Sequence, residues 1–146
     1  MSDEQRKRIL VVDDDPRLLH VVSVYLGGIE NYDVVTASSG EEALEVLAGT
    51  TPDLVILDVM MPGMDGIQVC EHIRQNPVTK DLPVLMFTAL SSDEDVARAQ
   101  RAGASKHITK PFTLGALGSV IRSFLQPSAA GSQAAGQLDE GAGSGM

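Results

Sequence analysis

Residues 54–66 read LVILDVMMPGMDG, and this stretch decides the fold. Its first four residues are all apolar, and Asp58 follows them directly. A strand that is apolar on both faces is typical of a parallel sheet covered by helices on both sides. Residues 9–16, ILVVDDDP, repeat the pattern, with four apolar residues before three aspartates. The two segments therefore predict buried parallel strands that end in carboxylates.

Short apolar runs and amphipathic stretches alternate along the rest of the chain. The runs predict strands at 9–12, 34–36, 54–57, 84–88 and 106–109. The stretches predict helices from Pro16 to the pair Gly27 and Gly28, over 41–48, from Ile67 onward, from a capping box at Ser91 or Ser92 to Gly103, and over 114–125. Five such repeats with short connections imply right-handed crossovers. The fold class is therefore α/β, a doubly wound five-stranded parallel sheet with helices on both faces.

Length and composition indicate one folded domain. The chain has 146 residues, of which 43% are hydrophobic. Residues 1–7 form a charged arm, 8–126 hold every predicted strand and helix, and 127–146 are rich in Gly, Ala and Ser. Such a tail has too little apolar surface to offset the entropy of ordering it. We therefore expect a domain over 8–126 and a disordered tail or linker over 127–146.

Charge and hydropathy exclude several classes of function. Lys and Arg total 11 against 20 Asp and Glu, which gives a formal net charge of -9. A chain this acidic lacks the basic footprint of a general nucleic-acid binder. No apolar run reaches the length of a membrane span or of a signal-peptide core. We therefore expect a cytoplasmic protein with no direct nucleic-acid or membrane partner.

Polar residues follow the predicted strands, at the edge where parallel sheets bind ligands. They are Asp13, Asp14 and Asp15 after the first strand, Asp58 after the third, Thr88 at the end of the fourth, and Lys110 after the fifth. Carboxylates gathered in one place favour a hard divalent cation, and Mg²⁺ suits one or two carboxylates with a phosphate oxygen. A carboxylate beside such an ion can attack phosphorus and form an acyl phosphate. Asp15 before Pro16 is better explained as a helix N-cap.

Four motifs in this order resemble the receiver domain of bacterial two-component response regulators. They are ILVVDDDP, LVILDVMMPGMDG, MFTAL and KPF, and the resemblance covers residues 8–126. It implies a flavodoxin-like sheet with strand order 2-1-3-4-5. It also implies a phosphorylation-activated switch in a phosphorelay, which takes its phosphoryl group from a sensor histidine kinase or phosphotransfer protein.

The resemblance assigns a role to each strand-end residue. Asp58 would be the phosphoacceptor, and Lys110 and the Thr88 hydroxyl would each contact a phosphoryl oxygen. Asp14 and Asp58 would bind Mg²⁺ directly, Asp13 through water, and the Met60 carbonyl would complete the protein ligands.

Three further positions carry structural expectations from the same resemblance. Pro111 would follow a cis peptide bond, and Gly66 would supply a positive φ in the loop after Asp58. His107 stands where the family usually has Tyr or Phe, as the switch residue that moves with Thr88. A histidine there would make activation pH-sensitive.

The expected output surface is formed by the fourth helix, the fifth strand and the fifth helix. The fourth helix would bury only Val96, Ala99 and Ala102, which anchor it weakly. Downstream protein partners would bind there, and a homodimer that forms on phosphorylation is compatible with the family. The protein would not be an enzyme in the usual sense, since its phosphotransfer and dephosphorylation act on itself.

Two alternatives remain open at this point. One is a degenerate receiver that works as a phosphorylation-independent binding module. The other is a small aspartate-nucleophile phosphohydrolase, which would carry its nucleophile in a D-x-D motif after the first strand. The segment from Asp13 to Pro16 lacks the rest of that motif.

Overall fold

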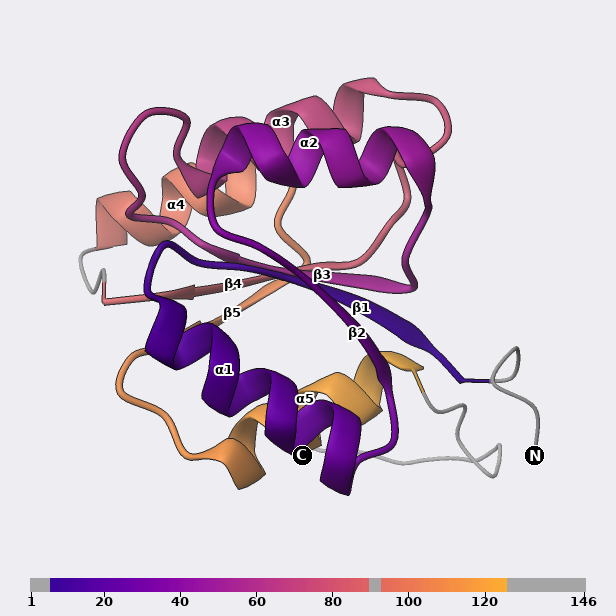
Figure 1. Cartoon of the computed structure of the whole chain (residues 1–146). Helices are drawn as coiled ribbons and strands as arrows, with labels where there is room; N and C mark the ends of the chain where they lie inside the picture. The colour runs from indigo at the N-terminus through magenta and orange to yellow at the C-terminus, as the bar shows by residue number, and fades with distance from the viewer. Residues whose placement is uncertain (1–5, 90–92, 126–146) are drawn as a thin grey trace, which may run out of the picture.

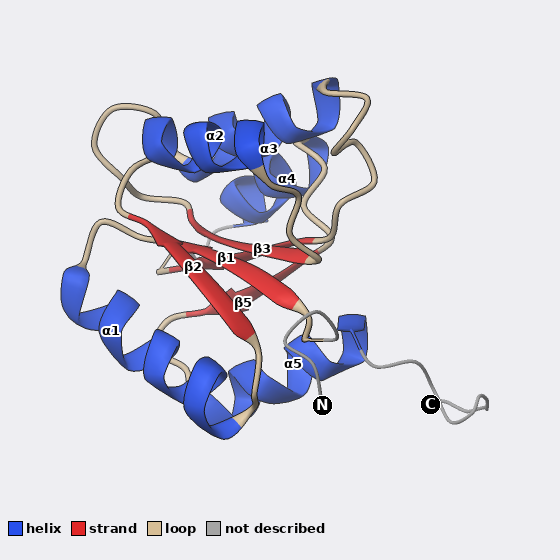
Figure 2. Cartoon of the chain, turned by 45° about the vertical axis from the view of Figure 1, so that its right-hand side comes forward, coloured by secondary structure: helices blue, strands red, loops and turns tan. Residues whose placement is uncertain are grey.

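The computed structural model describes residues 6–89 and 93–125, which form three layers (Figures 1 and 2). The strands are β1 (Arg8–Val12), β2 (Asp33–Ala37), β3 (Leu54–Asp58), β4 (Val84–Thr88) and β5 (Lys106–Thr109). The helices are α1 (Pro16–Val24), the π-helix η2 (Tyr25–Ile29), α2 (Gly40–Gly49), α3 (Gly66–Gln75), α4 (Asp93–Arg101) and α5 (Leu114–Leu125). All strand pairs are parallel, in the order β2-β1-β3-β4-β5. The predicted fold class and strand order are confirmed.

The sheet separates two apolar cores, because alternate residues of each strand point to opposite faces. In β1, Leu10 and Val12 pack on the side of α2, α3 and α4, whereas Ile9 and Val11 pack on the side of α1 and α5. Strand β3 is buried along its whole length. This burial explains why β1 and β3 have continuous apolar sequences.

Helix starts agree with the capping residues in the sequence. Asp15 is the N-cap of α1, and its side chain accepts a hydrogen bond from the backbone N–H of Arg17. Asp65 and Gln68 form a capping box at the start of α3. The capping box expected at Ser91 or Ser92 lies outside the described residues, as do the last residue of the predicted domain and the tail over 127–146.

The predicted end of the first helix is wrong. Helical backbone continues through Gly27 and Gly28 as η2, and the positive φ of 66° that ends it belongs to Asn31. The reason is tertiary: the Glu30 carboxylate accepts hydrogen bonds from the Tyr25 hydroxyl and from Arg122 of α5. These contacts hold the wide helical turn against α5, so two flexible glycines do not end the helix.

Candidate functional site

Three carboxylates meet at the carboxyl edge of the sheet. Asp13 and Asp58 follow the paired strand residues Val12 and Leu57, so neighbouring strands deliver them side by side. An oxygen of each, together with one from Asp14, lies within 4.8 Å of the others. Asp13 and Asp58 are 1% and 4% exposed, whereas Asp14 is exposed. A pair of buried carboxylates with a third at the surface is a donor set that suits a hard divalent cation with room for water.

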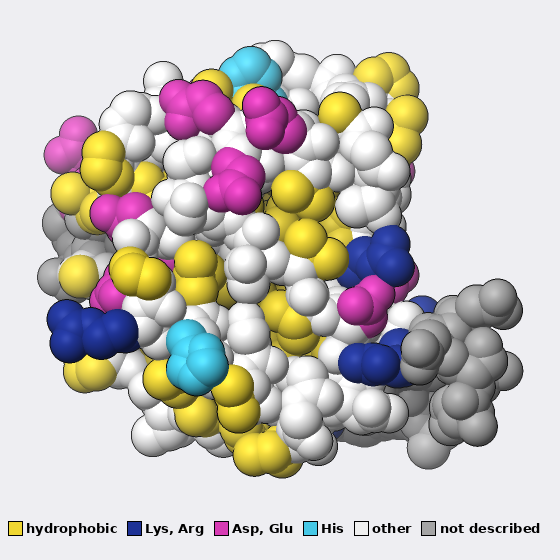
Figure 3. All heavy atoms as spheres, in the orientation of Figure 1, with side chains coloured by type: hydrophobic (Ala, Val, Ile, Leu, Met, Phe, Trp, Pro, Cys, Tyr) yellow, Lys and Arg dark blue, Asp and Glu magenta, His cyan; other side chains and the backbone are white. Residues whose placement is uncertain are grey.

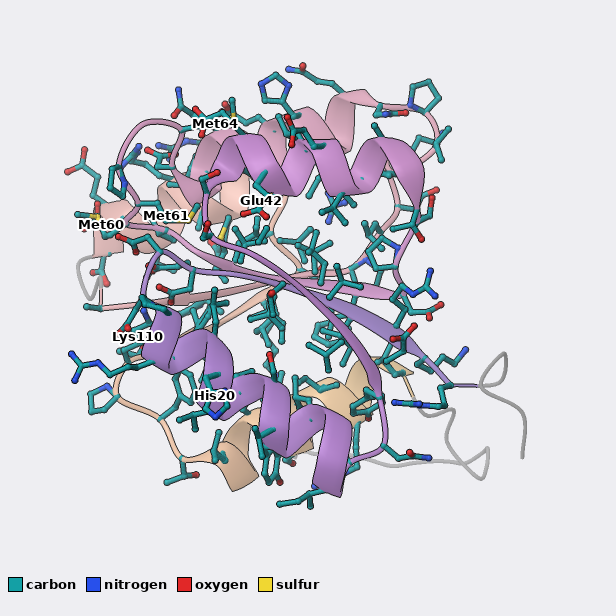
Figure 4. The ribbon with its side chains drawn as sticks, viewed as in Figure 1. His20, Glu42, Met60, Met61, Met64 and Lys110 are labelled. Carbon is teal, nitrogen blue, oxygen red and sulfur yellow. The ribbon has the colours of Figure 1, made fainter. Side chains whose placement is uncertain are left out.

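Lys110, the residue after the end of β5, completes the group. Its Nζ donates to Asp13 Oδ2 at 3.0 Å and lies 3.5 Å from Asp58 Oδ1. The other carboxylate oxygen of Asp13, Oδ1, accepts a hydrogen bond from the backbone N–H of Asp15, with 2.8 Å between nitrogen and oxygen. Lys110 and Met60 lie at the same end of the sheet in Figure 4. One ammonium therefore faces both buried carboxylates.

Burial raises the pKa of Asp58 above its ordinary value of 3.8. The neighbouring charge of Asp13 raises this pKa further, and the Lys110 ammonium and the Met60 N–H oppose the shift. The proton is therefore held more tightly here than in an isolated carboxyl group. A cation that enters the site would relieve the repulsion between Asp13 and Asp58.

Phe87 is a neighbour of the site that sequence reasoning missed. Its ring is fully buried, and Lys110 Nζ lies 4.9 Å from the ring centroid. Phe112 packs against the same ring, with centroids 5.6 Å apart and planes tilted by 54°. A signal was available, because Phe87 ends the apolar run of β4, but an aromatic residue in a buried strand usually serves only the core.

The loop after Asp58 depends on two glycines for different reasons. Gly63 has the positive φ, at 74°, so the expectation that Gly66 would supply it is wrong. Gly66 is instead the first residue of α3, and a Cβ there would lie 2.3 Å from the carbonyl oxygen of Asp58. Close contact between α3 and the end of β3, and not backbone conformation, therefore requires glycine at 66.

The other predicted site residues lie as follows. The Lys110–Pro111 peptide bond is cis, as expected. Thr88 ends β4 opposite Thr109, and the place of its hydroxyl lies outside the described part of the structure. His107 pairs with Met86 and shares its face of the sheet, the side that α3 and α4 cover. Met60 is 62% exposed, and its backbone nitrogen lies 3.4 Å from Asp58 Oδ1, to which it donates a hydrogen bond.

Comparison with known proteins identifies this arrangement. The family model for the response regulator receiver domain matches residues 9–122. The chain belongs to this family. Receiver domains of two-component response regulators act as signalling switches, so the predicted family and the predicted role as a signalling switch are confirmed. Neither the binding module nor the phosphohydrolase is favoured by the match.

Curated relatives include a transcriptional regulatory protein and a DNA-binding response regulator. The alkaline phosphatase synthesis transcriptional regulatory protein PhoP of Bacillus subtilis is 39% identical over 84% of this chain and 50% of its own length. The DNA-binding response regulator MtrA of Mycolicibacterium smegmatis is 39% identical over 85% of this chain and 53% of its own length. The chain thus spans about half the length of the curated relatives it matches.

Two solved receiver structures match this chain over nearly their own full length. A putative response regulator from Chloroflexus aurantiacus has a TM-score of 0.78 and 37% identity, over 83% of this chain and 98% of that one. The BeF3-activated receiver domain of DrrB, a protein of Thermotoga maritima, has a TM-score of 0.76 and 34% identity, over 84% of this chain and 99% of that one. None of the helices in the described residues has the length and apolarity that a membrane span requires.

Proposed function

We propose that this receiver domain accepts a phosphoryl group on Asp58 and that Asp13, Asp14 and Asp58, with the Met60 carbonyl, hold Mg²⁺ while it does so. The observation that carries the proposal is the position of Lys110 between Asp13 and Asp58, within a cluster of three carboxylates. Sensor histidine kinases or phosphotransfer proteins are the proposed donors, and cytoplasmic localisation belongs to the same proposal.

The chain's own groups divide the work of phosphoryl transfer. An Asp58 oxygen forms the bond to phosphorus, and the bond to the donor breaks with its electron pair on the leaving group. The Lys110 ammonium neutralises charge on a phosphoryl oxygen, and the Thr88 hydroxyl donates to another. Bound Mg²⁺ supplies Lewis-acid neutralisation of charge. Hydrolysis of the resulting acyl phosphate by water resets the domain.

Magnesium dependence tests the proposal directly. Wild-type protein incubated with a small acyl phosphate and Mg²⁺ should gain the mass of one phosphoryl group, measured on the intact protein, and lose it on mild alkaline treatment. Chelation of the metal should reduce the modified fraction to background, because the repulsion between carboxylates is then uncompensated. Phosphorylation of equal extent with and without chelator would contradict the metal part of the proposal.

A groove beside the site is the proposed docking surface for the phosphodonor. It encloses about 520 Å³ between α1 and the β5–α5 connection, and Lys110, Leu18 and Val21 are among the residues that line it. Val21, Val24 and Ile29 are 47%, 55% and 71% exposed. Figure 3 shows hydrophobic side chains around the histidine on α1, which Figure 4 labels as His20. A groove that runs from Lys110, beside the phosphoacceptor, onto an exposed apolar helix suits a helical donor protein.

Val21→Asp should slow phosphotransfer from a protein donor but not from a small-molecule donor. We expect the rate of phosphotransfer from a kinase or phosphotransfer protein to fall at least about ten-fold. Docking of the donor protein would bury the new aspartate charge in the apolar interface. The rate with a small acyl phosphate should not change. Val78→Asp, at a 74% exposed valine that does not line the groove, is the matched control. Equal loss with both kinds of donor would place the defect in the chemistry and not in docking.

Output is proposed to pass through the surface formed by α4, β5 and α5. Within helix α4 only Ala99 is buried, and Val96 is half-buried, so little apolar area holds the helix to the sheet. His107 faces the same side of the sheet and keeps its proposed role as switch residue beside Thr88. Downstream proteins, and a second copy after phosphorylation, are the proposed ligands of this surface.

A further inference from the structure

Among the described residues, three groups attract the Lys110 ammonium: two carboxylates, which carry a charge, and an aromatic ring, which does not. Asp13 and Asp58 are its ionic partners, at 3.0 and 3.5 Å. The third is the ring of Phe87, whose centroid lies 4.9 Å from Nζ. The face of an aromatic ring carries partial negative charge and attracts a cation at this distance.

The two ionic contacts use the same carboxylates that hold the proposed metal. When Mg²⁺ binds, much of the negative charge on Asp13 and Asp58 is neutralised, and their attraction for Lys110 falls. The attraction of the Phe87 ring does not depend on the metal, because the ring has no charge to share. An ammonium that loses its ionic partners and has no other anchor would turn toward solvent, since the Lys110 side chain is already 26% exposed.

We propose that Phe87 is a positioning residue, whose ring keeps the Lys110 ammonium over the site when the carboxylates bind metal. The inference rests on the proposed phosphorylation of Asp58. It assigns Phe87 no contact with the phosphoryl group: the ring acts through Lys110 alone. A leucine at this position would pack the aliphatic part of the lysine but would not attract its charge.

The surroundings of Phe87 make the ring a fixed anchor. It is fully buried in the core on the side of α1 and α5, where Leu85 and Leu117 belong to the same apolar cluster. Phe112, two residues after Lys110, contacts it at 5.6 Å between centroids. A ring held in this way cannot follow the ammonium, so it defines where the ammonium lies. Low surrounding polarity also strengthens the interaction.

Fluorination of the ring tests the proposal with little change in shape. Fluorine withdraws electrons from the ring face and weakens its attraction for a cation. Pentafluorophenylalanine placed at position 87 should lower the maximal rate constant of phosphorylation, with a small acyl phosphate and saturating Mg²⁺, about five-fold. This factor corresponds to a cation–π interaction of about 1 kcal/mol. The half-saturating donor concentration should not change, because Lys110 acts on the transferring group.

Two comparisons make the result specific. The same fluorinated residue at Phe112, which touches Phe87, should leave the rate within two-fold of wild type. Phe87→Leu should lower the rate to the same extent as fluorination at 87, after thermal unfolding has established that the variant is folded. Equal rates for the wild type and both Phe87 variants would overturn the proposal, as would equal losses from fluorination at 87 and 112.

Proton chemical shifts of Lys110 give a readout independent of turnover. Methylene protons beside Nζ that lie over a ring face shift upfield, and this shift should persist when Mg²⁺ is added to wild-type protein. It should disappear in Phe87→Leu. Loss of the upfield shift on addition of Mg²⁺ would show that the ring does not hold the lysine in the metal-bound state. Wild-type protein that is never phosphorylated would instead contradict the proposed function, so the two failures are distinguishable.

Discussion

Asp58→Asn should abolish the formation of acyl phosphate, because an amide oxygen is too weak a nucleophile to attack phosphorus. The expected result is no mass gain on the intact protein after incubation with a small acyl phosphate and Mg²⁺. Asp13 and Asp14 lie within the same cluster and serve as internal controls. Asp14→Asn should slow the reaction without moving the modified residue, which peptide mapping would identify. A phosphoryl group found on Asp13 or Asp14 in wild-type protein would refute the assignment.

Stability measurements show whether the loss in Asp58→Asn is chemical. Burial and the Asp13 charge raise the pKa of Asp58, so the folded state binds this proton more tightly than the unfolded chain does. The contribution of Asp58 to stability is therefore fully present below pH 3.8, and it is lost as the pH rises through the raised pKa of the folded state. Without metal, Asp58→Asn should raise Tm at pH 7 by roughly 3 °C. This increase in Tm should become smaller in acid, where Asp58 of the wild type is protonated in both the folded and the unfolded state. A Tm below that of wild type at pH 7 would contradict this account.

Gly66→Ala should cause the largest loss of stability among single-methyl changes in the described chain. The new Cβ would lie 2.3 Å from the carbonyl oxygen and 2.9 Å from the carbonyl carbon of Asp58, both backbone atoms that cannot rotate away. The start of α3 must then move from the end of β3. We expect a loss of about 3 kcal/mol in the free energy of unfolding, measured by denaturant titration, together with slower phosphorylation.

Gly115→Ala is the matched control for that substitution. It lies in α5, and apart from its chain neighbours and the nearby backbone of α5 itself, no described atom lies within 4 Å of a Cβ at this position. Alanine in a helix is preferred to glycine, so this variant should gain about 0.5 to 1 kcal/mol. Equal stabilities for Gly66→Ala and wild type would mean that the contact between α3 and β3 is looser than the distances indicate.

Much of the fold could be predicted because its signals are local. Four apolar residues before an aspartate, as in 9–13, identify a buried strand regardless of what surrounds it, and Asp15 before Pro16 identifies a helix start. The end of the first helix could not be predicted in this way. Gly27 and Gly28 are good local reasons for a helix to stop, but Glu30 contacts Tyr25 and Arg122, and α5 is far away in the sequence.

The candidate site likewise has features that the sequence predicts and features that only the tertiary structure shows. The order of motifs alone determined that Asp13, Asp14, Asp58 and Lys110 reach one edge of the sheet, since every parallel strand delivers its last residue there. Only the tertiary structure decided that Lys110 pairs more closely with Asp13, 97 residues away, than with Asp58, and that the Phe87 ring lies beneath its ammonium. It also decided that Gly66 is required by contact and not by φ. The periodicity of a sequence records which side of a strand is buried, whereas distances between side chains on different strands depend on how the strands and helices pack together.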